Sequence, residues 1–209
     1  GVKKLLECLE NEPVMWKVLI HLALCTGCRR GELAALQWEH IDWTKKQVKI
    51  CKSMYHVKGE KGIKLPKTND SNRTITIPDY MLQMLKYYKN RQTEQKLIQG
   101  QDWNGNNMLF TSRKGTYISP DTISCWFRFF LKKYDIPHIK FHALRHTSAS
   151  ILLASGTNIK TVSSRLGHSN LTTTNRYVHA LLDADVVAAD TLEQKLNFIE
   201  VGQKWDKNA

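Results

Sequence analysis

Acidic side chains are scarce in this 209-residue chain, which has 19 Asp and Glu against 31 Lys and Arg, for a formal net charge of +12. Residues 141–180 contain no Asp or Glu at all, although Arg145, Lys160, Arg165 and Arg176 lie among them. Soluble surfaces usually mix both signs of charge, so this stretch indicates an anionic partner such as nucleic acid. A basic protein without such a partner is the alternative.

A membrane span, a disulfide framework and a metal cluster are also missing from the sequence. The apolar run at residues 18–24 is too short and too interrupted to cross a membrane, and no signal peptide is visible. The five cysteines are odd in number, and the C-x-x-C pair Cys25 and Cys28 has no second pair to complete a zinc site. No acidic cluster suits Mg²⁺. We expect core thiols, no metal or cofactor, and a cytoplasmic protein of the bacterial cytosol or nucleoid.

Apolar periodicity predicts a chain that is mainly helical. Helices are expected at residues 3–9, 13–25, 32–38, 79–92, 120–134, 142–155, 158–167 and 170–179. Polar–apolar alternation predicts half-buried strands at 46–54 and 73–78. Residues 93–107 are expected to be a polar connection, and 108–110 a short buried strand.

Positive charge is concentrated at residues 45–73, which have nine Lys and Arg against only Glu60 and Asp70. The segment between the two predicted strands is rich in Lys and Gly, which is typical of an extended hairpin. A solvated charged hairpin is one interpretation. A hairpin that lies along phosphates is the interpretation we favour.

Four side chains with reactive or phosphate-binding chemistry follow one another in the acid-free stretch. His142 and Arg145 are three residues apart, so a helix places them on one face. Arg145 offers a planar fork of donors to a phosphate, and His142 can exchange a proton near neutral pH. His168 follows Gly167 at a predicted helix end. Tyr177 is a poor nucleophile at its free pKa of about 10, but beside Arg and His donors its phenolate could attack phosphorus.

These residues resemble the signature of the tyrosine recombinase family, the phage-type integrases. H-A-L-R-H at 142–146 and L-G-H-S-N-L-T-T-T-N-R-Y at 166–177 resemble the family's second box, H-x-x-R followed by L-G-H or L-G-W and a later Tyr. T-G-C-R-R-G-E at 26–32 resembles the first box, T-G-x-R-x-x-E. P-K-T-N-D-S-N-R at 66–73 resembles the K-T-x-x-S-x-R form found in integrases of conjugative transposons.

The resemblance implies a role for each matching residue. The implied catalytic residues are Arg29, Lys67, His142, Arg145, His168 and the nucleophile Tyr177. Glu32 would brace the site, Arg30 should point elsewhere, and Lys64 competes with Lys67 as the catalytic lysine. We expect further DNA contacts from basic side chains: Lys58, Lys61, Lys64, Arg73, Arg113, Lys114 and Arg165.

The implied chemistry is cleavage and rejoining of DNA strands without metal or ATP. Arg29 and Arg145 would bind the non-bridging oxygens of the scissile phosphate and stabilise the charge of its transition state. Tyr177 would attack and form a 3′-phosphotyrosyl link, while Lys67 protonates the leaving 5′-oxygen. His142 would assist proton transfer at the tyrosine, and His168 would hydrogen-bond the phosphate.

The expected protein is therefore the catalytic domain of a site-specific recombinase, an integrase of a mobile element. Its fold should be mainly α with a small antiparallel β-sheet (α+β) of about three to five strands. Residues 1–182 would form the catalytic domain, and N-terminal DNA-binding domains would be absent from this chain. Residues 183–209 would form an acidic helix and tail that covers its own core or docks in trans on a neighbouring subunit.

The expected partners are double-stranded DNA with a specific recombination site and further copies of the protein, a tetramer in the active assembly. Two alternatives remain open from the sequence. One is an enzyme like type IB topoisomerase, which cuts and reseals a single strand by the same chemistry. The other is a DNA-binding module without catalysis, which would require a substitution at Arg29, Arg145 or Tyr177 that the sequence does not have.

Overall fold

Seven α-helices and two small antiparallel sheets make up the part of the chain that the computed structural model describes, residues 2–57, 60–64, 72–104 and 107–167 with Thr172 and Thr174. The helices are α1 (Val2–Leu9), α2 (Val14–Thr26), α3 (Arg30–Ala34), α4 (Asp79–Gln99), α5 (Pro120–Lys133), α6 (Ala143–Ala154) and α7 (Ile159–Leu166). Short 3₁₀ turns are η1 (Trp38–His40) and η3 (Gly100–Asp102). The expectation of a mainly helical α+β fold is confirmed.

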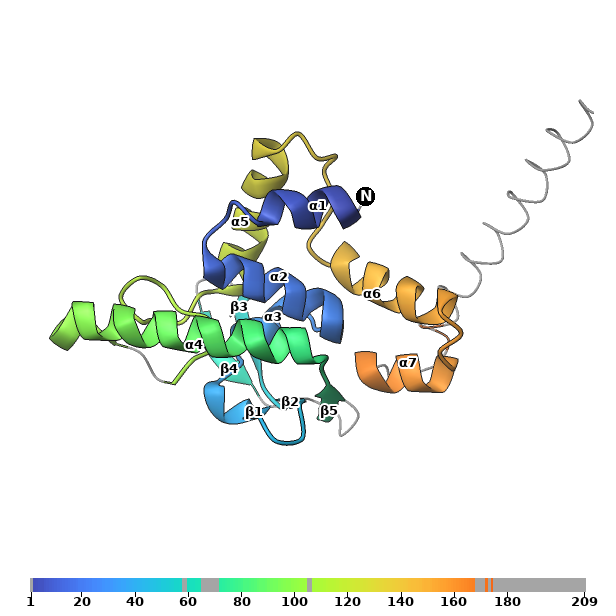
Figure 1. Ribbon diagram of the computed structural model, residues 1–209, viewed down its shortest axis with the longest axis horizontal. Helices are drawn as coiled ribbons and strands as arrows, with labels where there is room; N and C mark the ends of the chain where they lie inside the picture. Colours follow the sequence, from blue (N-terminus) through green and yellow to red (C-terminus); the bar gives the residue numbers. More distant parts are fainter. Residues whose placement is uncertain are drawn as a thin grey trace, which may run out of the picture.

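Helix α2 lies in the middle of the molecule (Figure 1), because its residues are apolar on nearly every side. Val18, Leu19, Ile20 and Leu22 have no exposed surface. A helix that is apolar all round must be covered by other elements, and α2 packs against α4, α3 and α6. The turn after α2 is therefore held at the centre of the molecule.

The strands form two sheets in the described chain. The first has the order β1 (Ile41–Asp42), β2 (Gln47–Ile50), β5 (Arg73–Thr76), and the second pairs β3 (Ser53–Val57) with β4 (Glu60–Lys64). The prediction of one strand at 46–54 is wrong: the chain leaves the first sheet after Ile50 and enters the second at Ser53. In the first sheet Val48 pairs with Ile75 and Ile50 with Arg73, so the inward face of β5 includes Arg73.

Three other predictions are wrong. The helix expected at 32–38 is instead α3, which ends at Ala34, and residues 35–38 are not α-helical. Helix α4 continues to Gln99 instead of ending at 92, and η3 follows it, so most of the predicted connection at 93–107 is helical. Residues 108–110 are buried as expected, but they form only an isolated bridge between Met108 and Gln37 rather than a strand. Their burial comes from packing beside α4, where Gln92 donates to the carbonyl of Leu109 at 3.1 Å.

Helices α6 and α7 pack on each other over a small apolar cluster of their own. Ala149, Val162 and Leu166 are its buried members, with Leu152 and Leu153 at its edge. Figure 1 shows this helical pair beside the end of α2, and α6 contacts α2 directly. The predictions at 142–155 and 158–167 are confirmed, with each boundary moved by one residue.

The predicted helix at 170–179 and the tail at 183–209 lie outside the described residues, apart from Thr172 and Thr174, which are helical. Among the described helices, none combines the length and the apolar composition needed to cross a lipid bilayer.

Candidate active site

Arg29 stands at the junction of α2 and α3. Helix α2 ends at Gly27, whose φ of 63° is left-handed and suits glycine. Arg29 is the N-cap residue of α3, and both its backbone N–H and its Nη1 donate to Glu32 at 2.9 Å. Its side chain is 42% exposed, so the guanidinium is held by Glu32 on one side while part of it still faces solvent.

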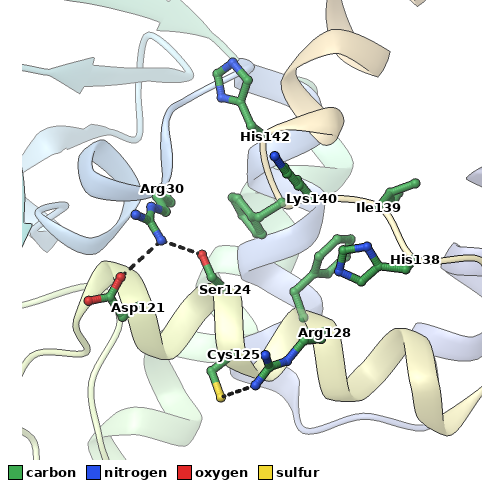
Figure 2. Close-up of a pocket in the computed structure, with 11 residues that line it drawn as sticks. Arg30, Asp121, Ser124, Cys125, Arg128, His138, Ile139, Lys140 and His142 are labelled. Carbon is green, nitrogen blue, oxygen red and sulfur yellow. Dashed lines mark hydrogen bonds and ion pairs between the residues drawn. The ribbon is translucent and has the colours of Figure 1, made fainter.

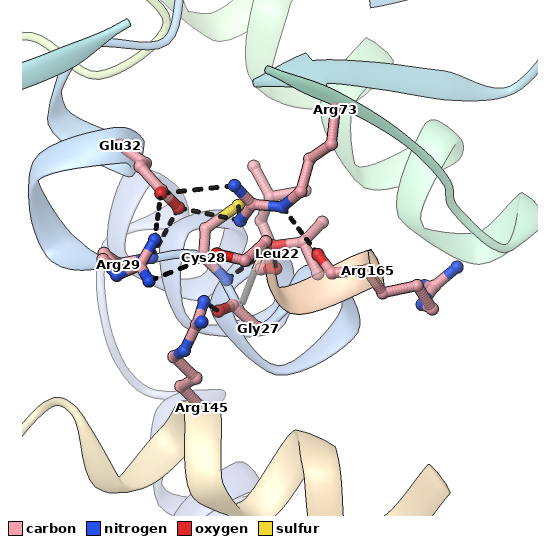
Figure 3. A network of polar contacts seen from close by, with 10 residues as sticks. Leu22, Gly27, Cys28, Arg29, Glu32, Arg73, Arg145 and Arg165 are labelled. Carbon is pink, nitrogen blue, oxygen red and sulfur yellow. Dashed lines mark hydrogen bonds and ion pairs between the residues drawn. The ribbon is translucent and has the colours of Figure 1, made fainter. Parts of the chain in front are cut away.

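Glu32 is shared between two arginines. Arg73 reaches it from β5, with Nη2 donating to Oε2 at 2.8 Å and Nη1 to Oε1 at 3.2 Å (Figure 3). The side chains of Glu32 and Arg73 are each 6% exposed. Burial alone would raise the pKa of Glu32, but the hydrogen bonds and charges of Arg73 and Arg29 outweigh it and lower that pKa. The carboxylate is therefore ionised at neutral pH.

Arg73 was expected to contact DNA, but in the structure its side chain is buried. Its guanidinium is turned into the protein, where it bonds to Glu32 and donates from Nε to the carbonyl of Arg165 at 2.6 Å. Arg165 itself, also predicted to contact DNA, is half-buried and donates from Nη2 to the carbonyls of Cys25 at 3.1 Å and Thr76 at 3.2 Å. That placement makes Arg165 a link between α7, α2 and β5.

Arg145 is the largest fully buried side chain of the described residues. It extends from α6 toward the turn after α2, where its Nη1 donates to the carbonyl of Gly27 at 2.7 Å (Figure 3). Its Nε and Nη2 are buried and have no acceptor among the described residues. Burial, followed by repulsion from Arg29, lowers the pKa of Arg145 to about 10, so the group is still charged at neutral pH. Nε and Nη2 of this charged, planar guanidinium are therefore two donors that suit an oxyanion such as a phosphate oxygen.

His142 begins α6, one turn before His146, and the two rings meet edge to face at 4.8 Å between centroids. Partial burial and then the charges of His146 and Arg145 lower the pKa of His142 below its ordinary value of 6.5. The imidazole is therefore neutral at pH 7 and able to accept a proton.

A cleft of about 370 Å³ lies beside these groups and is lined by Arg29, Tyr55, Lys64 and His142, among others. Lys64 stands at the end of β4 with its Nζ 5.6 Å from the centre of the Tyr55 ring. The cleft therefore brings one predicted catalytic arginine, one predicted catalytic histidine and the competing lysine to the same hollow.

A second hollow, of about 520 Å³, adjoins the first, since Arg30, Asp121, Phe141 and His142 line both. Figure 2 shows Arg30 turned toward α5, where its Nη1 donates to Ser124 Oγ at 2.7 Å and to Asp121 Oδ1 at 3.2 Å. Arg30 was expected to point elsewhere than Arg29, and its hydrogen bonds do go to α5, although it still lines the first cleft. Because Arg128 and Lys140 also line this hollow, the combined groove is basic along much of its length, as a surface for a phosphate backbone would be.

The remaining predicted residues are placed less completely. Lys58, Lys67, His168 and Tyr177 lie outside the described residues, as does the side chain of Lys61. The chain reaches Gly167, whose φ of 67° ends α7 and whose carbonyl lies 3.5 Å from Arg29 Nη2. Arg113 and Lys114 are exposed in the turn that bonds to Gln95 and Asn104 beside α4, rather than in the groove.

Sequence reasoning missed the parts of the site that hold the predicted residues in place. No sequence pattern indicates that the carbonyl of Gly27 accepts from Arg145 or that the ring of His146 packs on His142. Arg73 did have one, because it lies two residues before Ile75 on a strand, and alternate strand residues share a face. Within the described residues, no group of three or more His, Cys, Asp or Glu side chains is arranged to hold a metal ion.

Comparison with known proteins gives consistent matches. The sequence model of the phage integrase family matches residues 1–183. The tyrosine recombinase XerC-like protein of Caldanaerobacter subterraneus subsp. tengcongensis is 36% identical over 91% of this chain and 52% of its own. The ICEBs1 integrase of Bacillus subtilis is 29% identical over 93% of this chain and 53% of its own. The chain thus spans about half the length of the curated relatives it matches.

Solved structures share the fold. The Tn1549 transposon integrase in complex with transposon right end DNA superposes with a TM-score of 0.74 and 22% identity, over 91% of this chain and 64% of that one. The XerA recombinase superposes with a TM-score of 0.68 and 24% identity, over 85% of this chain and 57% of that one. With the family match over residues 1–183, these likenesses establish that the chain belongs to the phage integrase family and has the catalytic-domain fold of tyrosine recombinases.

Proposed function

We propose that the chain is the catalytic domain of a site-specific DNA recombinase that integrates or excises a mobile element. Its relatives are named as recombinases and integrases, and the Tn1549 transposon integrase is bound to transposon DNA in its structure. The proposed substrate is double-stranded DNA with a specific recombination site, within the bacterial cytosol or nucleoid.

The observation that carries the proposal is the convergence of Arg29 and Arg145 from separate elements. Gly27, whose carbonyl Arg145 binds, is only two residues from Arg29. The two positive charges repel strongly enough to contribute to the lowered pKa of Arg145. Holding like charges together destabilises a fold, so such an arrangement points to a bound anion that offsets the repulsion. A phosphodiester approaching its five-coordinate transition state is such an anion.

The proposed reaction uses the two arginines to bind the non-bridging oxygens. The Tyr177 oxygen attacks phosphorus, the bond to the 5′-oxygen breaks, and Lys67 gives that oxygen a proton. Neutral His142 takes the tyrosine proton, and His168 donates to the phosphate. The 3′-phosphotyrosyl link keeps the energy of the broken bond, so attack by a new 5′-hydroxyl rejoins a strand and releases the tyrosine without ATP.

We also propose that the active assembly contains several copies, a tetramer on two paired sites. Residues 183–209 would dock in trans on a neighbouring copy, because their sequence carries an acidic helix with an apolar stripe and the rest of the chain is basic. The first 182 residues would supply the site described above.

A covalent-capture experiment tests the proposed activity. The protein is incubated with a library of nicked duplexes of random sequence, in which the short fragment beyond the nick diffuses away after cleavage and prevents rejoining. We expect a protein–DNA adduct that survives denaturation, and sequencing of the captured DNA would give the site. Tyr177→Phe should bind the selected DNA with nearly unchanged affinity and form no adduct. An adduct with Tyr177→Phe would refute the choice of nucleophile, and no adduct with the unaltered protein would refute the activity.

A further inference from the structure

Arg73 is bonded to three different parts of the site at once (Figure 3). Its two terminal nitrogens donate to the two oxygens of Glu32, at 3.2 and 2.8 Å. Its Nε donates to the carbonyl of Arg165 at 2.6 Å, and Nη2 also lies 3.7 Å from Cys28 Sγ. The side chain is 6% exposed, so this guanidinium does not reach a ligand in the groove.

Two of these partners, Glu32 and Arg165, lead directly to residues proposed to act on the phosphate. Glu32 holds Arg29 through Nη1 and through the backbone N–H. Arg165 belongs to the last turn of α7, three residues before His168. Arg73 itself begins β5, six residues after Lys67, and the pairing of Arg73 with Ile50 fixes where that lysine-bearing segment ends.

Arg73 also sets the charge that Arg29 presents to the groove. Two guanidinium groups share the single carboxylate of Glu32, so the three side chains together carry one net positive charge. Without Arg73, Glu32 would be a buried carboxylate with Arg29 as its only described cationic partner. The carboxylate would then hold Arg29 more tightly and neutralise it, because an ion pair in a poorly solvated site is strong. Less of the charge of Arg29 would remain for a phosphate.

We propose that Arg73 is a positioning residue for strand cleavage, which acts through Glu32 on Arg29 and through the Arg165 carbonyl on the segment that leads to His168. This proposal rests on the proposed function. A lysine at this position could bond to Glu32 or to the carbonyl, but it lacks the planar fork that bonds to both together.

Arg73→Lys is the first variant, and Arg91→Lys is its matched control. Arg91 pairs with Glu94 at 2.6 Å on the exposed surface of α4, so the control makes the same chemical change outside the Glu32 network. We expect Arg73→Lys to slow single-turnover cleavage by roughly 10- to 100-fold, the loss typical of a misplaced catalytic group. DNA affinity and the rate of the control should stay near those of the unaltered protein.

A second substrate separates positioning from general loss of structure. In methylphosphonate DNA, one non-bridging oxygen of the scissile phosphate is replaced by a methyl group, so there is less charge for Arg29 to stabilise. Arg73→Lys should therefore slow cleavage of this DNA much less than cleavage of ordinary DNA. The proposal would be overturned if Arg73→Lys slowed cleavage of both substrates equally. It would also be overturned if the loss of cleavage rate equalled the loss of folded protein in the variant.

Two further measurements keep the test decisive. If Arg73→Lys does not fold, Arg73→Met with Glu32→Gln removes both buried charges together, and cleavage by this pair at the normal rate would overturn the proposal. If the unaltered protein cleaves no DNA, the proposed function fails, and ¹⁵N relaxation of the Arg29 Nε–H group still decides the role of Arg73. We expect that group to become less mobile in Arg73→Lys, because Glu32 would then hold Arg29 more tightly, and an unchanged signal would refute the proposal by itself.

Discussion

Replacing Gly27 with alanine should destabilise the protein and disturb both arginines of the site. Gly27 has a φ of 63°, where a Cβ is unfavourable, and an added Cβ would overlap Leu166 Cδ2 and lie 3.5 Å from Ser148 Oγ. Leu166 cannot simply swing away, because it is 1% exposed within the cluster between α6 and α7. The carbonyl of Gly27 is also the acceptor for Arg145.

The magnitude follows from two separate contributions. A left-handed conformation costs a residue with a Cβ roughly 1–2 kcal/mol, and overpacking a buried site costs typically about 1–3 kcal/mol. Their sum is about 2–5 kcal/mol, a large part of the roughly 5–15 kcal/mol that stabilises an ordinary domain. Any movement of α7 that relieves the overlap would also shift the Gly167 carbonyl beside Arg29.

Gly156→Ala is the matched control for the packing contribution. Gly156 also has a positive φ, 79°, but an added Cβ there would meet no atom within 4 Å. The unfolded chain loses the same freedom in both variants, so that contribution cancels in the comparison. Guanidinium chloride denaturation followed by circular dichroism should show Gly27→Ala to be less stable than Gly156→Ala by about 1–3 kcal/mol. Equal stabilities would refute the reasoning, since they would mean that α7 moves freely away from the turn.

Three further outcomes are expected. The folded-state pKa of Glu32 is lowered, so its contribution to stability is complete above the ordinary value of 4.5 and is lost as the pH falls through the folded-state pKa. As the pH is lowered, the denaturation midpoint should therefore fall more for the unaltered protein than for Glu32→Gln. Lys67→Ala should cleave ordinary DNA slowly and DNA with a bridging 5′-sulfur almost normally, since a thiolate leaves without a proton; rescue of Lys64→Ala alone would assign the role to Lys64. Deletion after Ala184 should leave the fold and DNA binding but weaken assembly, and sedimentation on DNA would test this, with identical complexes counting against docking in trans.

Local signals in the sequence predicted most of the helices. Ser119 and Pro120 predicted the start of α5, and Ser119 does accept from the backbone N–H of Thr122 at 3.1 Å. The end of α4 was placed too early because residues 93–99 are mostly polar. Polarity there reflects exposure on a helix that extends beyond the core, and no helix breaker occurs before Gly100.

The two sheets show that polar–apolar alternation predicts strands but not their pairing. The polar–apolar alternation holds from Gln47 to Ile50 and is interrupted at Cys51 and Lys52. Neither the alternation nor its interruption says which strand each part pairs with. Ile50 pairs with β5, whereas Ser53 pairs with β4. A change of partner is decided by contacts distant in sequence, so the pattern could not reveal it.

The sequence motifs predicted which residues form the candidate site. They did not predict the residues that hold those side chains in place. Arg29, Glu32, His142 and Arg145 are brought together in the structure. Arg73 was assigned to the DNA surface because it belongs to a basic segment, although its alternation with Ile75 placed it inside. A positive charge counts toward binding DNA only where it is exposed. The catalytic roles of all six residues, Lys67, His168 and Tyr177 included, stay predictions.

The arginines around the site donate largely to main-chain carbonyls. Arg145 bonds to residue 27, Arg165 to residues 25 and 76, and Arg73 to residue 165. Every amino acid has a carbonyl, so a substitution at an acceptor position keeps the acceptor, whereas a substitution of the arginine loses the donor. Relatives should therefore vary freely at residues 25 and 76 without any compensating change in the arginines. Methods that infer contacts from correlated substitutions would miss these bonds.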